Sequence, residues 1–391
     1  MNKVELLSPA GSLEKIKWAI HYGADAIYIG GEMFSLRANA INFKLEEIEE
    51  AVMLCHAHNV KLYVALNIVF HDQDVKELDE YLLALAKIKI DAIIISDVYA
   101  IKRARELIPE IDVHVSTQAS ILNREAALYY QSLGATRVVL ARETSLNTIK
   151  DIIDHTNLEV EVFIHGAMCS SFSGRCTLSN NMTNRDANHG GCSQVCRFDF
   201  ELLADKKNIT AEYPFSLAAK DLMMAEYINE LIAAGVHSLK IEGRMRSIYY
   251  IAMVVGTYRK IIDYYLSNDD LIRLQRCANR EAVPQFLKSI PDEQAAYYNG
   301  RMEISNQDFL GIILDYDPKT QLMKIEERNA FEIGTAVTIF SAKNKPFDFI
   351  INELLDEDLN PITRANHPHQ IIYIKTPKPV QKRDIMHLKI T

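Results

Sequence analysis

Hydrophobic and polar positions change their period along the chain, and the changes predict where strands and helices lie. From Val4 onward, eight short runs rich in Val, Ile and Leu recur, each followed by a polar or glycine-containing turn. Such near-continuous apolar runs are typical of parallel strands that are buried on both faces of a sheet. The predicted strands are VELLSP, DAIYIGG, VKLYVALN, DAIIISD, DVHVSTQ, TRVVLAR, VEVFIHG and SLKIEGR.

The segments between these runs predict helices, because their apolar residues recur at three- and four-residue steps. Glycine ends several of them, as in YGADAIYIG, LGATRVVLA and AGVHSLKIE, where it fits a helix C-cap that leads into a buried strand. Eight strand–helix units predict an α/β fold, a TIM-like (β/α)8 barrel over residues 1–267. A six-stranded doubly wound sheet is the weaker alternative.

The last part of the chain has a different pattern. Residues 268–307 read as a polar, helical connector. After Phe309, apolar and polar residues alternate in short segments that are separated by turn formers such as YDPKTQ and AKNKP. Alternation with a period of two is typical of strands. We therefore predict a small C-terminal all-β barrel domain over residues 308–391.

Polar side chains follow the predicted strands at their carboxyl ends, where a (β/α)8 barrel forms its active site. They are Ser8, Asn67, Asp97, Ser116, Gln118, Arg142, Glu143, His165, Glu242 and Arg244. Of these, we assign Ser8, Asn67 and Gln118 to substrate binding.

Arg142 and Arg244 come directly after buried strands, and a guanidinium at such a position suits the bidentate capture of a carboxylate or phosphate. We assign both arginines to substrate binding and, with His165 and Glu242, to catalysis. The alternatives are a solvated surface cation, which is the usual fate of arginine, and structural pairing with Glu143 and Glu242.

The connection after the seventh strand, residues 166–217, is far longer than the ~2–6 residues that usually join a strand to the next helix. It contains four of the six cysteines: Cys169, Cys176, Cys192 and Cys196. Cys55 and Cys277 lie in helical patterns and are interpreted as inert thiols. Clustered thiolates bind a metal, exchange redox equivalents or supply a nucleophile, so the insertion is the main candidate for chemistry.

The spacing of the four cysteines favours an iron–sulfur cluster over zinc. Structural zinc sites usually have tight pairs two to four residues apart, and only Cys192 and Cys196 resemble one. A 4Fe–4S cluster takes four thiolates with less regular spacing. Disulfide exchange ranks third. In a further alternative, Cys169 is a nucleophile with His165 as its base, but thiolates that hold a metal cannot also act as nucleophiles.

Composition narrows the class of protein only a little. The net charge of −9 gives no overall basic footprint for nucleic acid, although local basic patches can still bind RNA. No apolar run reaches the ~20 residues that span a bilayer, and the N-terminus has no signal-peptide pattern. We therefore expect a soluble, cytoplasmic protein without a membrane partner, in which clustered cysteines favour metal binding or catalysis over structural disulfides.

Residues 161–179 resemble the signature of the collagenase-like peptidases, family 32 of the class with unassigned catalytic type. The matching positions are Glu161, Phe163, Gly166, Ala167, Met168, Cys169, Gly174, Cys176, Leu178 and Ser179. SPAGS near the N-terminus, GADAIYIGG followed by FSLRA, STQ, LKIEGRMRS and the C-terminal β-domain are also similar to the family. The resemblance covers essentially the whole chain.

The resemblance implies hydroxylation chemistry in spite of the family name. Members make 5-hydroxyuridine at the tRNA wobble position, hydroxylate a ribosomal RNA cytidine, or act on the ubiquinone ring. They carry a 4Fe–4S cluster on four cysteines, whose counterparts here are Cys169, Cys176, Cys192 and Cys196, and the RNA-modifying groups depend on prephenate. Prephenate is a dicarboxylate, which Arg142 and Arg244 are suited to bind.

The favoured hypothesis is an enzyme that hydroxylates the wobble uridine of tRNA with prephenate and a 4Fe–4S cluster. The length of the chain and its terminal β-domain favour this type of member. A collagenase-like peptidase, as the family name states, and a zinc-stabilised RNA-binding scaffold are the alternatives.

Overall fold

The computed structural model describes residues 3–36, 42–210, 214–278, 280–297 and 308–389. Arg37 and Ala38 of the FSLRA motif, residues 211–213 of the insertion, and residues 279 and 298–307 of the expected connector lie outside the described residues. The chain divides into two compact units. The first comprises Met1–Ile20, Ala24–Arg246 and Arg280–Met302, and the second His21–Gly23, Ser247–Asn279 and Glu303–Thr391.

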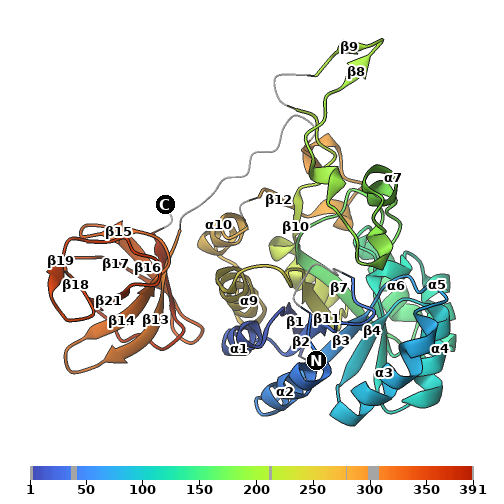
Figure 1. Ribbon diagram of the computed structural model, residues 1–391, viewed down its shortest axis with the longest axis horizontal. Coiled ribbons are helices and arrows are strands. Elements are labelled where there is room, and N and C mark those ends of the chain that lie inside the picture. Colours follow the sequence, from blue (N-terminus) through green and yellow to red (C-terminus); the bar gives the residue numbers. More distant parts are fainter. Residues whose placement is uncertain (1–2, 37–41, 211–213, 279, 298–307, 390–391) are drawn as a thin grey trace. The chain divides into compact units, whose positions relative to one another are not determined.

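The first unit is built on a closed barrel of eight parallel strands (Figure 1). They are β1 (Glu5–Pro9), β2 (Ala26–Gly30), β3 (Lys61–Leu66), β4 (Ala92–Ile95), β5 (Asp112–Val115), β6 (Arg137–Val139), β7 (Glu159–Gly166) and β11 (Ser238–Ile241). Each pairs with the next, and β11 pairs in parallel with both β7 and β1, which closes the sheet. All eight lie where the apolar runs predict strands, so the barrel is confirmed and the doubly wound sheet is excluded.

Helices alternate with these strands along the chain. They are α1 (Leu13–His21), α2 (Leu45–His56), α3 (Val75–Ile88), α4 (Val98–Leu107), α5 (Arg124–Ser132), α6 (Leu146–His155), α8 (Ile228–Ala233) and α9 (Ile248–Asp263), with short 3-10 turns at η1 (Thr117–Ala119) and η4 (Ala225–Tyr227). The side chains of Asp97, Asn123 and Ser145 accept backbone N–H bonds at three helix starts. Such caps satisfy donors that the first turn leaves open, so these sequence positions fix where the helices begin.

The barrel contains a buried ionic network. Arg137 Nη1 lies 2.6 Å from Glu5 Oε1 and 3.1 Å from Glu161 Oε2, and Lys240 Nζ donates to Glu161 Oε1 at 2.7 Å. Glu161 is completely buried, and the partners come from β1, β6, β7 and β11. Because such charges cost several kcal/mol to desolvate, each depends on its partners to stay inside the barrel.

The insertion after β7 folds into short elements and returns to the barrel. It contains α7 (Leu178–Thr183), η2 (Ala187–His189), η3 (Val195–Arg197), the strands β8 (Leu203–Ala204) and β9 (Lys207–Asn208), which form a hairpin projecting from the barrel in Figure 1, and β10 (Asp221–Met223). Strand β10 pairs antiparallel with β7, with Leu222 opposite Gly166. The segment expected as a helical connector begins with helix α10 (Asn268–Arg276), but its β12 (Ala282–Val283) pairs with β10. The 3-10 turns η5 (Gln285–Leu287) and η6 (Glu293–Ala295) follow.

The second unit contains an antiparallel sheet that forms a half-barrel. Its order is β17 (Phe347–Ile350), β16 (Ala336–Phe340), β22 (Ile385–Leu388), β13 (Phe309–Asp317), β14 (Leu322–Glu327), β21 (Ile371–Lys375), β18 (Leu354–Leu355) and β19 (Pro361–Ile362). A smaller ribbon pairs β15 (Phe331–Glu332) with β20 (Arg364–Ala365). Ile313, Met323, Val337 and Ile339 are fully buried in its core. The predicted all-β domain is therefore confirmed.

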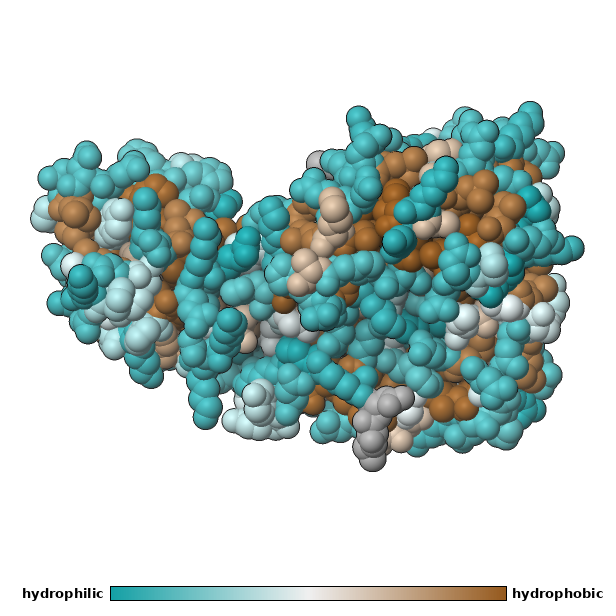
Figure 2. Space-filling view, turned by 90° about the horizontal axis from the view of Figure 1, so that it is seen from below, coloured by the Kyte–Doolittle hydropathy of each residue, from teal (hydrophilic) through white to brown (hydrophobic). Residues whose placement is uncertain are grey.

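The surface is mixed in character. Figure 2 shows hydrophobic areas that are interrupted by hydrophilic side chains on one face of the molecule. Within the described residues, no helix combines the length and the apolar composition needed to cross a bilayer.

Candidate active site

A cavity of about 490 Å³ opens at the carboxyl ends of the barrel strands. Its lining combines residues that follow β3, β5, β6 and β11 with residues of the insertion. The predicted site residues in its wall are Asn67, Gln118, Arg142, Glu242, Arg244, Cys169, Cys176, Cys192 and Cys196. The structure thus brings most of the predicted candidates to one place.

Local structure in the insertion brings the two cysteine pairs together. The Asn188 side chain donates to the Cys176 carbonyl at 2.9 Å, and the Ser193 N–H donates to Ser179 Oγ at 3.0 Å. Thr183 Oγ1 lies 2.8 Å from Ser193 Oγ. These bonds join the segment that carries Cys169 and Cys176 to the one that carries Cys192 and Cys196. None of the six cysteines, all of which are described, forms a disulfide.

The thiols of the insertion influence one another electrostatically. Cys169 is reached by solvent but is otherwise enclosed, and this burial raises the pKa of its thiol. Cys176 and Cys196 raise it further, whereas the backbone at Ser171 and the charge of Arg142 lower it. Thiolates that repel one another need a cation to neutralise them, so the set suits a positively charged metal centre.

The distances between the cysteine sulfurs bear on which kind of metal site they can form. Zn–S bonds of ~2.3 Å in a tetrahedral site place sulfurs ~3.8 Å apart. No three cysteine sulfurs lie within 4.8 Å of one another in the described part of the chain. In this arrangement the thiols do not form a closed zinc site. Four thiolates on one cavity wall match the ligand set of a 4Fe–4S cluster, which takes one at each of its four irons.

Arg142 presents charge to the cavity. It follows β6, and its guanidinium carbon lies 4.0 Å from the centre of the Phe163 ring. Its Nε is buried and has no hydrogen-bond partner within the described residues. Glu143, which could have paired with it, instead accepts bonds from the N–H and hydroxyl of Ser173 at 3.1 and 3.0 Å. Arg142 therefore suits an anionic ligand.

Arg244 is held by the protein itself. It is 7% exposed, and its guanidinium donates to Ser35 Oγ at 2.9 Å and to the Leu36 carbonyl. A Cβ at Gly30 would overlap Nη1 of Arg244 and Ser35 Oγ, so a side chain at this position would displace the arginine from its hydrogen bonds. Arg244 thus orders the loop after β2, although it also forms part of the cavity wall.

Two residues assigned to substrate binding or catalysis, Ser8 and His165, lie outside the cavity lining. Of the other strand-end candidates, Asp97 and Glu143 also lie outside it, and Ser116 lines it. Ser8 is fully buried, and its hydroxyl donates to the Pro9 carbonyl at 3.2 Å. His165 is 1% exposed, and burial, with a smaller contribution from Arg246, lowers its pKa to about 3. His165 is therefore neutral at physiological pH. Glu242, in contrast, lines the cavity and accepts a bond from Tyr28 Oη at 3.1 Å.

Lys240 lines the cavity and was missed by sequence reasoning. It projects from β11, and its Nζ lies 4.5 Å from the centre of the Tyr28 ring. Burial lowers the pKa of Lys240, although the ion pair with Glu161 opposes that change. The signal in the sequence was a charged residue within the apolar run SLKIEG.

Further arginines surround the cavity. Arg246 donates to Asp221 Oδ2 at 3.1 Å, and Arg280 lies 3.7 Å from Asp221 Oδ1. Burial and the neighbouring Arg280 lower the pKa of Arg197, a sign of crowded positive charge. Phe172, which is 53% exposed, also lines the cavity. The site therefore combines thiols, cations and an accessible aromatic ring, which suits an anionic ligand with a planar group.

These features define a (β/α)8-barrel protein with a four-thiol cavity built by an insertion after the seventh strand. Residues 11–297 match peptidase family U32, and residues 305–387 match the peptidase family U32 C-terminal domain. The chain belongs to peptidase family U32, which confirms the resemblance.

Relatives in this family have different names. A tRNA hydroxylation protein P1 of Bacillus subtilis is 42% identical over 98% of this chain and 94% of its own length. A 23S rRNA 5-hydroxycytidine C2501 synthase of Escherichia coli is 38% identical over 76% of this chain and 44% of its own length. A collagenase of Porphyromonas gingivalis is 36% identical over 68% of this chain and 67% of its own length.

Proposed function

We propose that this protein is an RNA hydroxylase that converts the wobble uridine of tRNA to 5-hydroxyuridine in a prephenate-dependent reaction. The observation that carries the proposal is the convergence of four cysteines and Arg142 on one cavity. The names of the Bacillus and Escherichia relatives support RNA as the substrate, and the Bacillus relative supports tRNA.

Cys169, Cys176, Cys192 and Cys196 would hold a 4Fe–4S cluster in this proposal. The cluster would supply one-electron chemistry to the cavity. The protein's own part is to fix the thiolates from two segments of the insertion and to offset their charge. Arg142, which lowers the pKa of Cys169, supplies part of that offset.

The cavity offers separate features for the acid and for the base. Arg142 is suited to a carboxylate of prephenate, because a guanidinium binds that group through two parallel hydrogen bonds. Phe172 is exposed at the same wall and can stack on an unpaired base, the usual way in which single-stranded RNA loops are bound. Asn67 and Gln118 supply amide groups for hydrogen bonds to either ligand.

The cofactor assignment is tested by anaerobic purification and measurement of iron, sulfide and visible absorption. We expect the wild type to hold about four irons per chain, in line with a cluster on four cysteines. Cys192→Ser should lose most of this iron, whereas the matched variant Cys277→Ser should keep it. Colourless, iron-free protein with full activity would reject the cluster.

The substrate assignment is tested in a strain that lacks the gene. Mass spectrometry of tRNA nucleosides should show loss of 5-hydroxyuridine, restored by the wild type and by Cys277→Ser but not by Cys192→Ser. If tRNA from the deletion strain is unchanged but ribosomal RNA loses 5-hydroxycytidine, the nucleotide in the proposal is wrong and the reaction type stands.

A peptidase is the second candidate, because one relative is named a collagenase. The same variants separate the two ideas. A Cys169 nucleophile tolerates Cys192→Ser better than a four-thiolate cluster does. Collagen cleavage by purified Cys192→Ser protein that contains no iron would favour the peptidase.

A further inference from the structure

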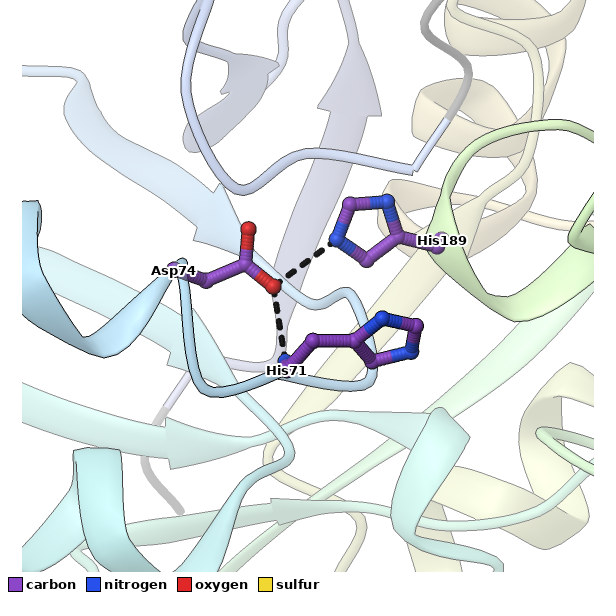
Figure 3. A group of neighbouring side chains, drawn as sticks. All are labelled: His71, Asp74 and His189. Atoms are coloured by element: carbon purple, nitrogen blue, oxygen red, sulfur yellow. Dashed lines mark hydrogen bonds and ion pairs between the residues drawn. The ribbon is translucent and has the colours of Figure 1, made fainter.

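A second group of potential metal ligands lies where the loop after β3 meets the insertion (Figure 3). His71 and Asp74 come from the loop between β3 and α3, and His189 comes from η2 of the insertion. One ligand atom from each of the three lies within 4.8 Å of the other two. It is the only such group among the described residues, and the candidate active site does not use it.

The three residues already contact one another. His189 Nε2 lies 2.9 Å from Asp74 Oδ2, and the backbone N–H of His71 donates to the same oxygen at 2.7 Å. The rings of His71 and His189 stack with their centres 4.8 Å apart. Zn–N bonds of ~2.1 Å place tetrahedral ligands ~3.4 Å apart, so only small movements are needed to admit an ion.

A fourth candidate ligand is Asp186, which precedes η2. Its Oδ2 lies 3.7 Å from His71 Nε2. Its other oxygen, Oδ1, accepts the Asn188 N–H at 2.8 Å, which leaves Oδ2 facing His71. Two imidazoles and two carboxylates are a common donor set for divalent transition metals.

We propose that His71, Asp74 and His189 bind a divalent transition-metal ion, with the fourth position taken by Asp186 or by water. Zinc fits best, because it accepts four nitrogen and oxygen ligands in a tetrahedron. The ion takes the place of the proton that His189 shares with Asp74, and that proton leaves to solvent. His71 is about half exposed, which gives the ion a path to the site.

The ion joins two parts of the cavity wall. Asn67 lines the cavity before His71, and Asn188 and Gly190 line it on either side of His189. The backbone N–H of Val69 also donates to the Asn188 carbonyl at 2.9 Å, so the two loops already contact each other. Metal binding therefore fastens the cysteine-bearing insertion to the loop after β3, beside the substrate cavity but separate from its thiols.

The test is a titration of the anaerobically purified, iron-loaded protein with Co²⁺, followed by absorption. A nitrogen–oxygen site gives the weak d–d bands of Co²⁺ without the strong charge-transfer bands of a thiolate site. We expect one such ion per chain, displaced by Zn²⁺. His189→Asn and His71→Gln should each weaken binding by more than the ~10–100-fold that is typical for loss of a group that merely supports a ligand.

Matched variants keep the result interpretable. His155 also pairs with an aspartate, Asp151, at 3.2 Å, so His155→Asn should leave Co²⁺ binding unchanged. Zinc should protect the insertion of the wild type, but not of His189→Asn, from limited proteolysis. Thiolate charge-transfer bands alone, or binding that His189→Asn and His71→Gln leave intact, would overturn the proposal. Iron content is measured in parallel, so loss of the cluster is distinguished from loss of this site.

Discussion

At the scale of single residues, the ability of a charged side chain to bind a ligand depends on whether other protein groups already hydrogen-bond to it. Arg244 is bound by Ser35 and Leu36, whereas the buried Nε of Arg142 makes no hydrogen bond in the described part of the chain. Two arginines at equivalent strand ends therefore differ in the hydrogen bonds that the protein offers them. Sequence alone could not separate them, because the distinction lies in partners that are distant along the chain.

Replacement of Arg142 by glutamine should weaken the binding of prephenate without unfolding the protein. A charge-assisted hydrogen bond contributes ~1.5–3 kcal/mol, which corresponds to about 10- to 150-fold in affinity. Isothermal titration with prephenate measures the change. Arg175→Gln is the control, because Arg175 is exposed and outside the cavity lining. Equal affinities of the two variants would remove Arg142 from the acid site.

His165 should make the protein sensitive to acid. Its pKa is about 3 in the folded state and about 6.5 when unfolded, so protons bind the unfolded state more readily. Its contribution to stability is complete above pH 6.5 and is lost toward pH 3, by roughly 1.4 kcal/mol per pH unit. Burial also lowers the pKa of His21, His114 and His387. His165→Gln should therefore reduce the pH dependence of urea-unfolding stability between pH 6.5 and 4 without removing it, and exposed His58→Gln should not change it. A pH dependence that His165→Gln leaves unchanged would contradict this.

At the scale of elements, the strands with long apolar runs could be predicted from the sequence, and the very short strands of the same sheet could not. All eight barrel strands could be found, because strands buried on both faces have long apolar runs. Strands β10 and β12 have only three and two residues, too few for any period. Likewise, the convergence of the cysteines followed from their shared insertion, whereas the group around His71 and His189 depends on two loops that meet only in the folded chain.

The end of β2 should not tolerate a side chain. Gly30→Ala would overlap the guanidinium of Arg244, and such overpacking costs ~1–3 kcal/mol. The double variant Gly30→Ala/Arg244→Ala should recover part of that loss relative to the sum of the single changes. Chemical denaturation of the four proteins measures the coupling. Simple additivity would show that Arg244 is not the residue that excludes a Cβ.

At the scale of the whole molecule, the two units have separate cores. The barrel contains a network of buried charges, whereas the C-terminal sheet packs an entirely apolar cluster around residues such as Ile339. A substitution in the core of the C-terminal sheet should therefore leave the cavity intact, because none of the core residues of the sheet lines the cavity.

Ile339→Ala should destabilise the second unit by ~2–5 kcal/mol, the usual cost of removing a large buried aliphatic side chain. Hydrogen exchange measured by mass spectrometry should increase over residues 308–389 and not over the barrel strands. Iron content should equal that of the wild type. Faster exchange throughout β1 to β7 would show instead that the two units unfold together.

The return of β10 to β7 has a consequence for how this protein family can diversify. The insertion leaves the barrel at Gly166 and comes back at Leu222, which pairs with that same glycine. The two ends of the insertion therefore lie side by side. The length and sequence of the residues between them can change while the pairing of the barrel strands stays the same. Exchanging the insertion between relatives would therefore disturb the barrel little, because both of its ends are anchored on β7.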